Sequence, residues 1–210
     1  MRPKEFDIDV ADENLTGFAS NVTGASFVLT ATAPTDGIAH QVSIKNDSGT
    51  DHSGKTVTLV GTDADNLAQT EVVTGPGAAA TVESTKYFKT LTSATPSSTI
   101  GADTFDIGWV DEVTTKTIPI DWRSQIAAAV SVYVTGTINF SVQETFDAVQ
   151  SPATIKPQQD AHWVAVTALA SKTAHTTAQV SVGATAIRVI VNSYSSGAEL
   201  QAHVSQPMNT

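Results

Sequence analysis

The stretch that decides the fold is "KTVTLVGTDADNLAQTEVVTGP", from Lys55 to Pro76. Two runs rich in β-branched residues flank the segment "ADNL", which places an Asp and an Asn between them. This pattern is typical of two antiparallel strands joined by a turn, because Asp and Asn stabilise reversals of the chain. Comparable short runs recur at "SFVLTATA" from Ser26, "DTFDIGWVDEV" from Asp103 and "AIRVIVNSY" from Ala186. The sequence therefore predicts an all-β protein.

The composition supports this fold class and narrows the function. Charged residues make up 15% of the 210 residues, below the roughly 25% of an average globular chain. Eleven Lys and Arg against 21 Asp and Glu give a net charge of -10, which argues against partners such as nucleic acid or an anionic membrane. Without cysteine, disulfides and thiolate metal sites are excluded. The chain shows neither a secretory h-region nor an apolar run of about 20 residues, so we expect a soluble protein made in the cytoplasm.

The strand patterns divide the chain into an arm and two domains. Residues 1–25 show no clear alternation and are expected to form an irregular N-terminal arm. A first β domain is expected over residues 26–115 and a second over residues 116–210, each sandwich- or barrel-like with antiparallel strands. The segment "RSQIAAAVSVYV" (123–134) permits a helix, but its alternating valines favour a strand. A last hairpin is predicted over residues 186–205, with Arg188 near Glu199.

One segment matches a phosphate-binding motif. "GTDHSGKT", from Gly49 to Thr56, fits G-x-x-x-x-G-K-[ST] at every fixed position. Phosphate binding requires a helix directly after the glycine loop, whereas "TVTLVGTD" after Lys55 has the pattern of a strand. The preceding "HQVSIKN" also has a strand pattern, so we interpret the motif as the connection of a hairpin and expect no bound nucleotide.

A second candidate is the acidic segment that contains Asp63, Asp65, Asn66 and Glu71. Aligned on a calcium-binding loop from Asp63, it lacks the central glycine and the final glutamate of that motif. We therefore favour Asx-type hydrogen bonds to the turn backbone over a calcium site.

Hydrolase and zinc signals are weak. "DHS" (51–53) brings three triad residue types together in sequence, but neighbours on an extended chain point apart. The histidines show no zinc spacing; they are His40, His52, His162, His175 and His203. Asp103 and Asp106 are the best candidates for a glycosidase carboxylate pair, although they more simply flank a strand. The sequence thus assigns no catalytic, cofactor-binding or metal-binding residue.

Aromatic residues are expected mainly in the two cores, because few are available to fill them. The expected core aromatics are Tyr87, Phe88, Phe105 and Trp109 in the first half, and Trp122, Tyr133, Phe140, Phe146 and Trp163 in the second. The alternative is an exposed aromatic stripe that binds sugars.

Several stretches resemble structural proteins of tailed bacteriophages. In the first half these are "VTLVGTDADNLAQTEVVTGPG" and "TVESTKYFKTLTSATPS", which are similar to a recurrent hairpin followed by "STKYFKTVTS". This chain has Asn66 where a glycine is common in that hairpin. The second half is similar through "INFSVQETFDAVQ", "HWVAVTAL" and "ATAIRVIVNSYSSGAELQAHVSQ", so the resemblance covers about residues 40 to 207. It implies a virion component without a catalytic motif, either a head decoration protein or a neck or collar protein.

The leading hypothesis is therefore a non-enzymatic structural protein of a phage particle, synthesised in the host cytoplasm. Its expected partners are copies of itself and other virion proteins of the capsid, portal, connector or tail, with neighbours covering its sheet edges. The N-terminal arm is expected to order on docking. The alternatives are a fibre-like module that binds host glycans, and a glycan-cleaving enzyme that uses Asp103 and Asp106.

Overall fold

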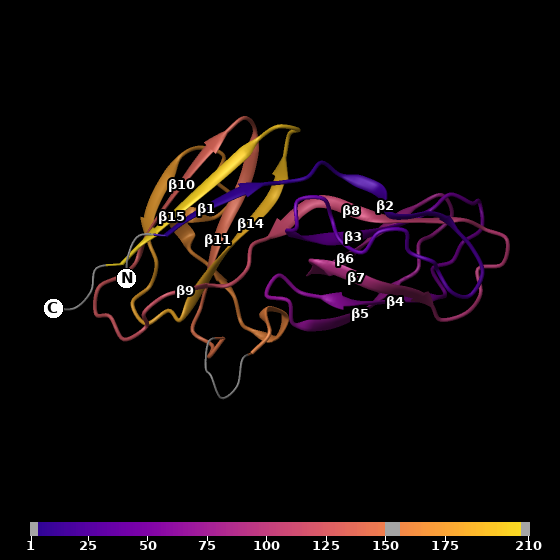
Figure 1. Ribbon diagram of the computed structural model, residues 1–210, viewed down its shortest axis with the longest axis horizontal. Coiled ribbons are helices and arrows are strands. Elements are labelled where there is room, and N and C mark those ends of the chain that lie inside the picture. The colour runs from indigo at the N-terminus through magenta and orange to yellow at the C-terminus, as the bar shows by residue number, and fades with distance from the viewer. Residues whose placement is uncertain (1–3, 150–155, 207–210) are drawn as a thin grey trace. The chain divides into compact units, whose positions relative to one another are not determined.

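The computed structural model describes residues 4–149 and 156–206, and the chain forms two compact units. The central unit is Ala11–Val113, and the terminal unit combines Met1–Val10 with Thr114–Thr210. The central unit is thus formed by one continuous stretch of the chain, whereas the terminal unit combines residues from before and after that stretch. Regular structure in both units is almost entirely β (Figure 1), which confirms the all-β prediction. In the described ranges no helix is long and apolar enough to cross a membrane.

The central unit is a sandwich of two sheets. The first has the strand order β2 (Asn14–Val22), β8 (Phe105–Thr114), β3 (Ala39–Asn46) and β6 (Thr81–Phe88). The second has the order β5 (Ala68–Thr74), β4 (Thr56–Thr62) and β7 (Thr90–Pro96). Strands β4 and β5 pair antiparallel from Thr56↔Thr74 to Thr62↔Ala68. The hairpin predicted from Lys55–Pro76 is thus confirmed.

The core of the central unit is formed by alternate residues of both sheets. Phe18 on β2 packs edge-on against Trp109 on β8, with ring centroids 5.2 Å apart, and Leu59 on β4 belongs to the same buried cluster. Gly17 allows this close packing, because a Cβ at that position would lie 2.1 Å from the Trp109 ring. A larger residue at position 17 would therefore force the indole out of the core.

The β4–β5 turn is stabilised by Asx hydrogen bonds. Oδ1 of Asp63 accepts hydrogen bonds from the backbone N–H groups of Asp65 and Leu67, each at 2.9 Å. Asn66 has a φ of 64°, a conformation that glycine adopts freely and that Asn tolerates better than most residues. The interpretation of the acidic segment as a turn is confirmed, and Asn66 can take the conformation for which the related hairpins use glycine.

The edges of the two sheets are joined along a seam between β5 and β6. The carboxylate of Glu71 accepts hydrogen bonds from the backbone N–H groups of Thr85 (2.8 Å) and Lys86 (3.0 Å), and from the Thr85 hydroxyl. Lys86 Nζ donates to the Thr70 carbonyl in return, and Gln69 Nε2 donates to the carbonyl of Tyr87. Side chains of β5 therefore take the place of a ladder partner along this edge of β6 and join the two sheets.

A buried pair of hydrogen-bonded side chains, Asp36 and His40, fixes the start of the central unit. The Asp36 carboxylate accepts hydrogen bonds from the backbone N–H groups of Ala11 (2.8 Å) and Ile38 (2.9 Å). His40, which is fully buried, lies with Nε2 2.8 Å from Asp36 and with Nδ1 2.8 Å from the Val110 carbonyl. Both ring nitrogens thus face oxygen acceptors. Burial acts to raise the pKa of Asp36, but the hydrogen bond and charge of His40 and the two backbone donors lower it below its usual value.

The lowered pKa of Asp36 predicts a specific acid sensitivity. A group whose pKa is lower in the folded state stabilises the fold above its unfolded pKa, here 3.8, and loses that contribution as the pH falls through the folded pKa. We expect the difference in unfolding free energy between the wild type and Asp36→Asn to be constant above about pH 5 and to shrink below about pH 4. Denaturant titrations at several pH values measure it. Because burial raises the pKa of Asp111 and Glu112, which acts in the opposite sense, only the difference is informative. A difference that stayed constant down to pH 2 would contradict this assignment.

The terminal unit also has two sheets. The first has the strand order β1 (Lys4–Asp9), β15 (Glu199–Ser205), β10 (Ala129–Thr135) and β13 (Thr176–Gln179). The second has the order β12 (Val164–Ala165), β11 (Ile138–Thr145) and β14 (Ala186–Tyr194), and β9 (Ile118–Pro119) pairs with β14. Two 3-10 turns, η1 (Gln158–Asp160) and η2 (Thr167–Leu169), complete it. Strand β10 confirms the strand interpretation for the second half of "RSQIAAAVSVYV", from Ala129 on, whereas residues 123–128 form a loop that precedes the strand.

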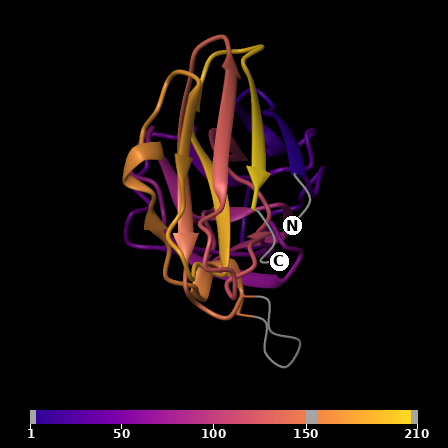
Figure 2. The same cartoon turned by 90° about the vertical axis from the view of Figure 1, so that its left-hand side faces the viewer.

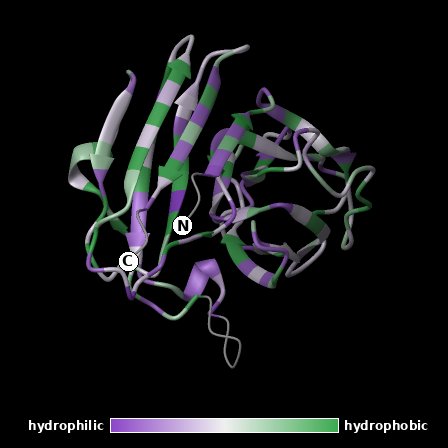
Figure 3. Cartoon of the chain, turned by 60° about the vertical axis from the view of Figure 1, so that its left-hand side comes forward, coloured by the Kyte–Doolittle hydropathy of each residue, from purple (hydrophilic) through white to green (hydrophobic). Residues whose placement is uncertain are grey.

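Alternation along the strands gives the first terminal sheet one apolar and one polar face. Val130, Val132, Leu200 and Ala202 are buried on its inner face. Hydrophobic and hydrophilic residues alternate along the ribbon (Figure 3), and β15 runs antiparallel to β10 beside it (Figure 2). The outer face therefore carries the side chains at odd positions of β10 and β15, such as Tyr133.

The prediction of an irregular N-terminal arm is wrong for most of its length. Lys4–Asp9 is an edge strand that pairs with β15 at six positions, and Asn14–Val22 is a strand that pairs with β8. The register of β2 is irregular, which explains the lack of clear alternation in its sequence. The division after Val113 lies beside the boundary expected near residue 115, but residues 4–10 belong with the second domain rather than with an arm.

Two predicted hairpins are wrong as pairings. Strands β3 and β4, on either side of "GTDHSGKT", belong to different sheets, so this segment crosses between the sheets. Strands β14 and β15 also lie in different sheets. Arg188 is consequently not beside Glu199: its guanidinium lies 4.5 Å from the centroid of the Trp163 ring, and its Nε donates to Gln143. The sequence pattern marks where strands lie but not which sheet each one joins.

Candidate functional site

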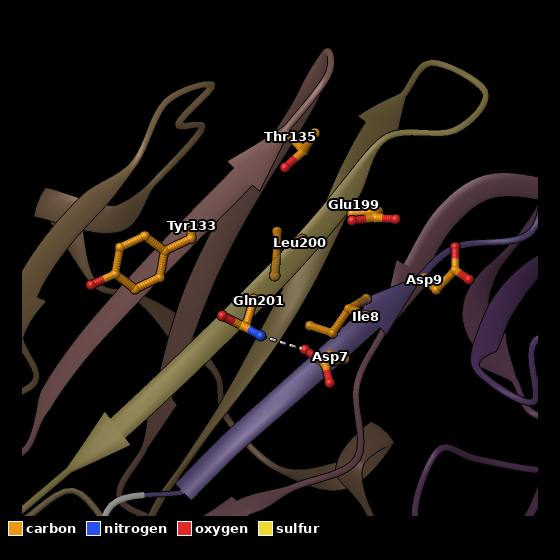
Figure 4. A pocket seen from close by; sticks show the side chains of 8 residues that line it. All are labelled: Asp7, Ile8, Asp9, Tyr133, Thr135, Glu199, Leu200 and Gln201. Atoms are coloured by element: carbon orange, nitrogen blue, oxygen red, sulfur yellow. Dashed lines mark hydrogen bonds between the residues drawn. The ribbon is translucent and has the colours of Figure 1, made fainter.

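The outer face of the β1–β15–β10 sheet carries a depression of about 370 Å³. Its lining consists of Asp7, Ile8, Asp9, Tyr133, Thr135, Glu199, Leu200 and Gln201 (Figure 4). All of these residues belong to the terminal unit and come from the three adjacent strands. We call this depression the acidic pocket, because three of its eight residues are carboxylates.

The strand register arranges the polar residues of the pocket in rows. Asp7, Gln201 and Tyr133 lie directly opposite one another across β1, β15 and β10. One row along, Asp9 lies opposite Glu199. Like charges at opposite positions of a sheet destabilise it. The carboxylates of Asp9 and Glu199 have no hydrogen-bond or ion-pair partner within residues 4–149 and 156–206. The pocket is thus negatively charged without an internal counter-ion for this pair.

Gln201 orders the other side of the pocket. Its Nε2 donates hydrogen bonds to Glu5 Oε1 at 2.6 Å and to Asp7 Oδ1 at 2.7 Å, the second of which is drawn in Figure 4. Its Oε1 lies 2.9 Å from Nε2 of His203, which then acts as the donor. One amide therefore holds two carboxylates and a histidine in place.

Tyr133 presents its ring at the surface beside these groups. Two histidine rings pack against it: the centroid of His175 lies at 5.6 Å, and that of His203 at 5.4 Å in an edge-on arrangement. Nδ1 of His175 accepts the backbone N–H of Val134, which fixes the orientation of that ring. Tyr133 is nevertheless 49% exposed, so it offers an oriented aromatic surface next to carboxylates. Such a surface suits a cationic or polyhydroxylated group.

The phosphate-loop match has no structural counterpart. Lys55 is followed directly by strand β4, and its Nζ donates to the carbonyl of Thr99 at 2.6 Å rather than pointing freely into solvent. The loop therefore lacks the helix N-terminus that a phosphate cradle requires.

The hydrolase candidates form structural hydrogen bonds. Nε2 of His52 donates to Asp103 at 2.9 Å, and Asp51 accepts the backbone N–H of Ser53. The hydrogen bond with His52 is the main cause of the lowered pKa of Asp103. Asp106 accepts the backbone N–H of Asn21, and burial is the main cause of its raised pKa. In the described part of the chain, no group of three or more His, Asp or Glu side chains could hold a metal ion.

The prediction that the aromatic residues are buried is confirmed for some positions and wrong for others. Phe88, Phe105, Trp109 and Phe140 are buried as predicted, and Tyr87 and Trp163 are half-buried. The prediction is wrong for Trp122, Tyr133 and Phe146, which are 56%, 49% and 55% exposed. Phe18 and Phe27, which sequence reasoning left out, belong to the central core.

No protein-family model matches the chain, and no characterised protein matches its sequence.

Proposed function

We propose that this chain is a non-enzymatic structural subunit of a tailed-phage particle, which decorates or stabilises the capsid or contributes to the neck or collar. The virion assignment is supported by the resemblance of its quoted stretches to phage structural proteins. Those stretches contain Asn66, which lies at the β4–β5 turn, and the residues Glu71 and Lys86, which form the seam between β5 and β6. The segment that resembles the phage proteins therefore forms the β4–β5 hairpin and supplies the side chains that join this hairpin to strand β6.

One observation carries the proposal that the chain acts as a subunit: large aromatic side chains lie on the surface of the terminal unit. Trp122, Tyr133 and Phe146 are each about half exposed. An exposed aromatic is stabilised when another surface covers it, and Trp and Tyr are enriched at the centres of protein interfaces. Contacts with further copies of the chain and with other virion proteins would cover these residues.

The experiment is localisation on particles. A tagged chain produced during infection should co-sediment with particles, and gold-labelled antibody should mark either the head surface or the neck. Label at the head surface would identify a decoration protein, and label at the head–tail junction would identify a neck or collar protein. A chain that stayed in the soluble fraction while particles formed normally would refute the proposal.

A second candidate, a host-glycan-binding module, is favoured by the exposed ring of Tyr133 beside the hydrogen-bonding groups of the acidic pocket. Aromatic rings stack on the apolar faces of sugars while carboxylates and amides bind the hydroxyls. A glycan array separates the two functions: binding that is lost in Tyr133→Ala would support the module.

A further inference from the structure

A loop at one end of the first terminal sheet presents a tryptophan to solvent. Trp122 is 56% exposed, and the guanidinium of the neighbouring Arg123 lies 5.2 Å from the centroid of its ring. Ile126, four residues on, is also exposed. We call residues 121–126 the Trp122 loop. The loop also contains the exposed Asp121, whose Oδ1 accepts the backbone N–H of Arg123 at 3.1 Å. It therefore presents an apolar surface with the guanidinium of Arg123 as its single cationic group, in a chain whose net charge is -10.

The Trp122 loop is held in shape by buried polar groups. Gln206, 3% exposed, accepts the backbone N–H of Asp121 at 2.9 Å and donates to the carbonyls of Asp121 and Ile126. Ser124, also buried, donates from its backbone N–H to the Asp121 carbonyl, and its hydroxyl accepts the backbone N–H of Ile126. The exposed tryptophan therefore projects from an ordered loop, and binding through it would require little further loss of conformational entropy.

The acidic pocket lies at the opposite end of the same sheet. The Trp122 loop leads into β10 at Ala129, which pairs with Ser205, whereas the pocket is lined by Thr135 and Glu199 at the other end of these strands. At roughly 3.3 Å per residue, the ends of β10 are about 20 Å apart. The loop is fixed at its own end by Gln206, so it cannot fill the pocket of its own chain.

We propose that the Trp122 loop of one copy docks into the acidic pocket of a second copy. This inference rests on the proposed function, in that it names the contact through which the subunits would associate. Arg123 supplies the positive charge that Asp9 and Glu199 lack, and the exposed faces of Trp122 and Tyr133 cover one another. A desolvated Trp and Arg at the centre of a contact are the residues that most often dominate binding.

The contact joins two different surfaces, and two symmetries satisfy it. In a head-to-tail arrangement each copy keeps one free loop or pocket after the first contact, so association continues until a ring closes or a filament grows. In a two-fold dimer each loop fills the pocket of the other copy, and association stops at two.

Cysteine cross-linking tests the proposal, because the chain has no cysteine of its own. Gln125→Cys marks the loop and Thr135→Cys marks the pocket; both positions are exposed. Mixing the two single variants under mild oxidation should give a covalent heterodimer. A chain carrying both substitutions should give a ladder of multimers if the contact is head-to-tail and a doubly linked dimer if it is two-fold. The matched control replaces Thr135→Cys with Ser53→Cys, an exposed position in the central unit. A heterodimer yield no higher than that of the control would overturn the proposal.

Charge reversal separates a specific contact from random collision. Arg123→Glu and Trp122→Ala should each lower the heterodimer yield about tenfold or more. The pocket variant Asp9→Lys/Glu199→Lys should restore the yield with Arg123→Glu. Melting curves of each variant show that it is folded. Absence of this rescue would show that the loop does not bind the pocket through these charges. Binding of a glycan to the pocket of a chain that forms no cross-link would also refute the proposed contact. If the chain is found on particles while the cross-link fails, the proposed function stands and only this contact is wrong.

Discussion

Asp36→Ala is expected to destabilise the central unit by about 3–5 kcal/mol, because three hydrogen bonds to a buried carboxylate are lost together. The substitution leaves the backbone N–H groups of Ala11 and Ile38 without their acceptor, and it leaves fully buried His40 beside an empty space. Water can replace such partners only where it can enter, so most of the hydrogen-bond energy is lost.

The three tryptophans permit a local measurement of this effect. Trp109 is the one in the central unit, and Trp122 and Trp163 lie in the terminal unit. In a background of Trp122→Phe and Trp163→Phe, denaturant unfolding followed by fluorescence reports on the central core. The control Asp51→Ala, which removes an exposed turn carboxylate, should change stability by less than about 1 kcal/mol. An equal effect of the two substitutions would show that the Asp36–His40 pair is dispensable.

Glu71→Ala should lower the stability of the central unit by about 2 kcal/mol, because it removes three hydrogen bonds that join β5 to β6. Glu71→Gln keeps one carbonyl oxygen as an acceptor and should lose about half as much. The effect should be local as well as global: the amides of Thr85 and Lys86 lose their acceptors and should exchange faster with deuterium.

Glu83→Ala is the matched control for the seam. Glu83 is exposed on the same strand β6, and its removal should change stability by less than about 0.5 kcal/mol. Unchanged protection of the Thr85 and Lys86 amides in Glu71→Ala would mean that the edges are held together by something other than this carboxylate.

Local patterns predicted most of the strands from β3 onward but not their partners, and they missed β1 and β2. Asp63 and Asn66 stabilise their turn through contacts within four residues, so the β4–β5 hairpin was predictable. The pairing of β1 with β15 depends on residues at the other end of the chain, and no local signal in Lys4–Asp9 identifies it. The same limit explains why β14 and β15 were wrongly paired: short spacing favours a hairpin, whereas burial of apolar faces from two sheets decides the outcome.

The candidate site could have been predicted in part. Tyr133 lies between Val132 and Val134, so alternation alone places it on the face opposite Val132. The acidic row could not be predicted, because Asp9 and Glu199 meet only through the β1–β15 register. The Trp122 loop also depends on a distant residue, since buried Gln206 determines the conformation of residues 121–126.

We propose above that this chain is a structural component of a virus particle. Quantitative mass spectrometry tests this proposal on particles purified from lysates that contain the chain, with the major capsid protein as the internal standard. We expect the chain to be present in multiple copies, in a fixed ratio to the capsid protein that persists through repeated purification. Absence of the chain from purified particles, in a lysate that contains it in soluble form, would show that it is not a structural component of the particle.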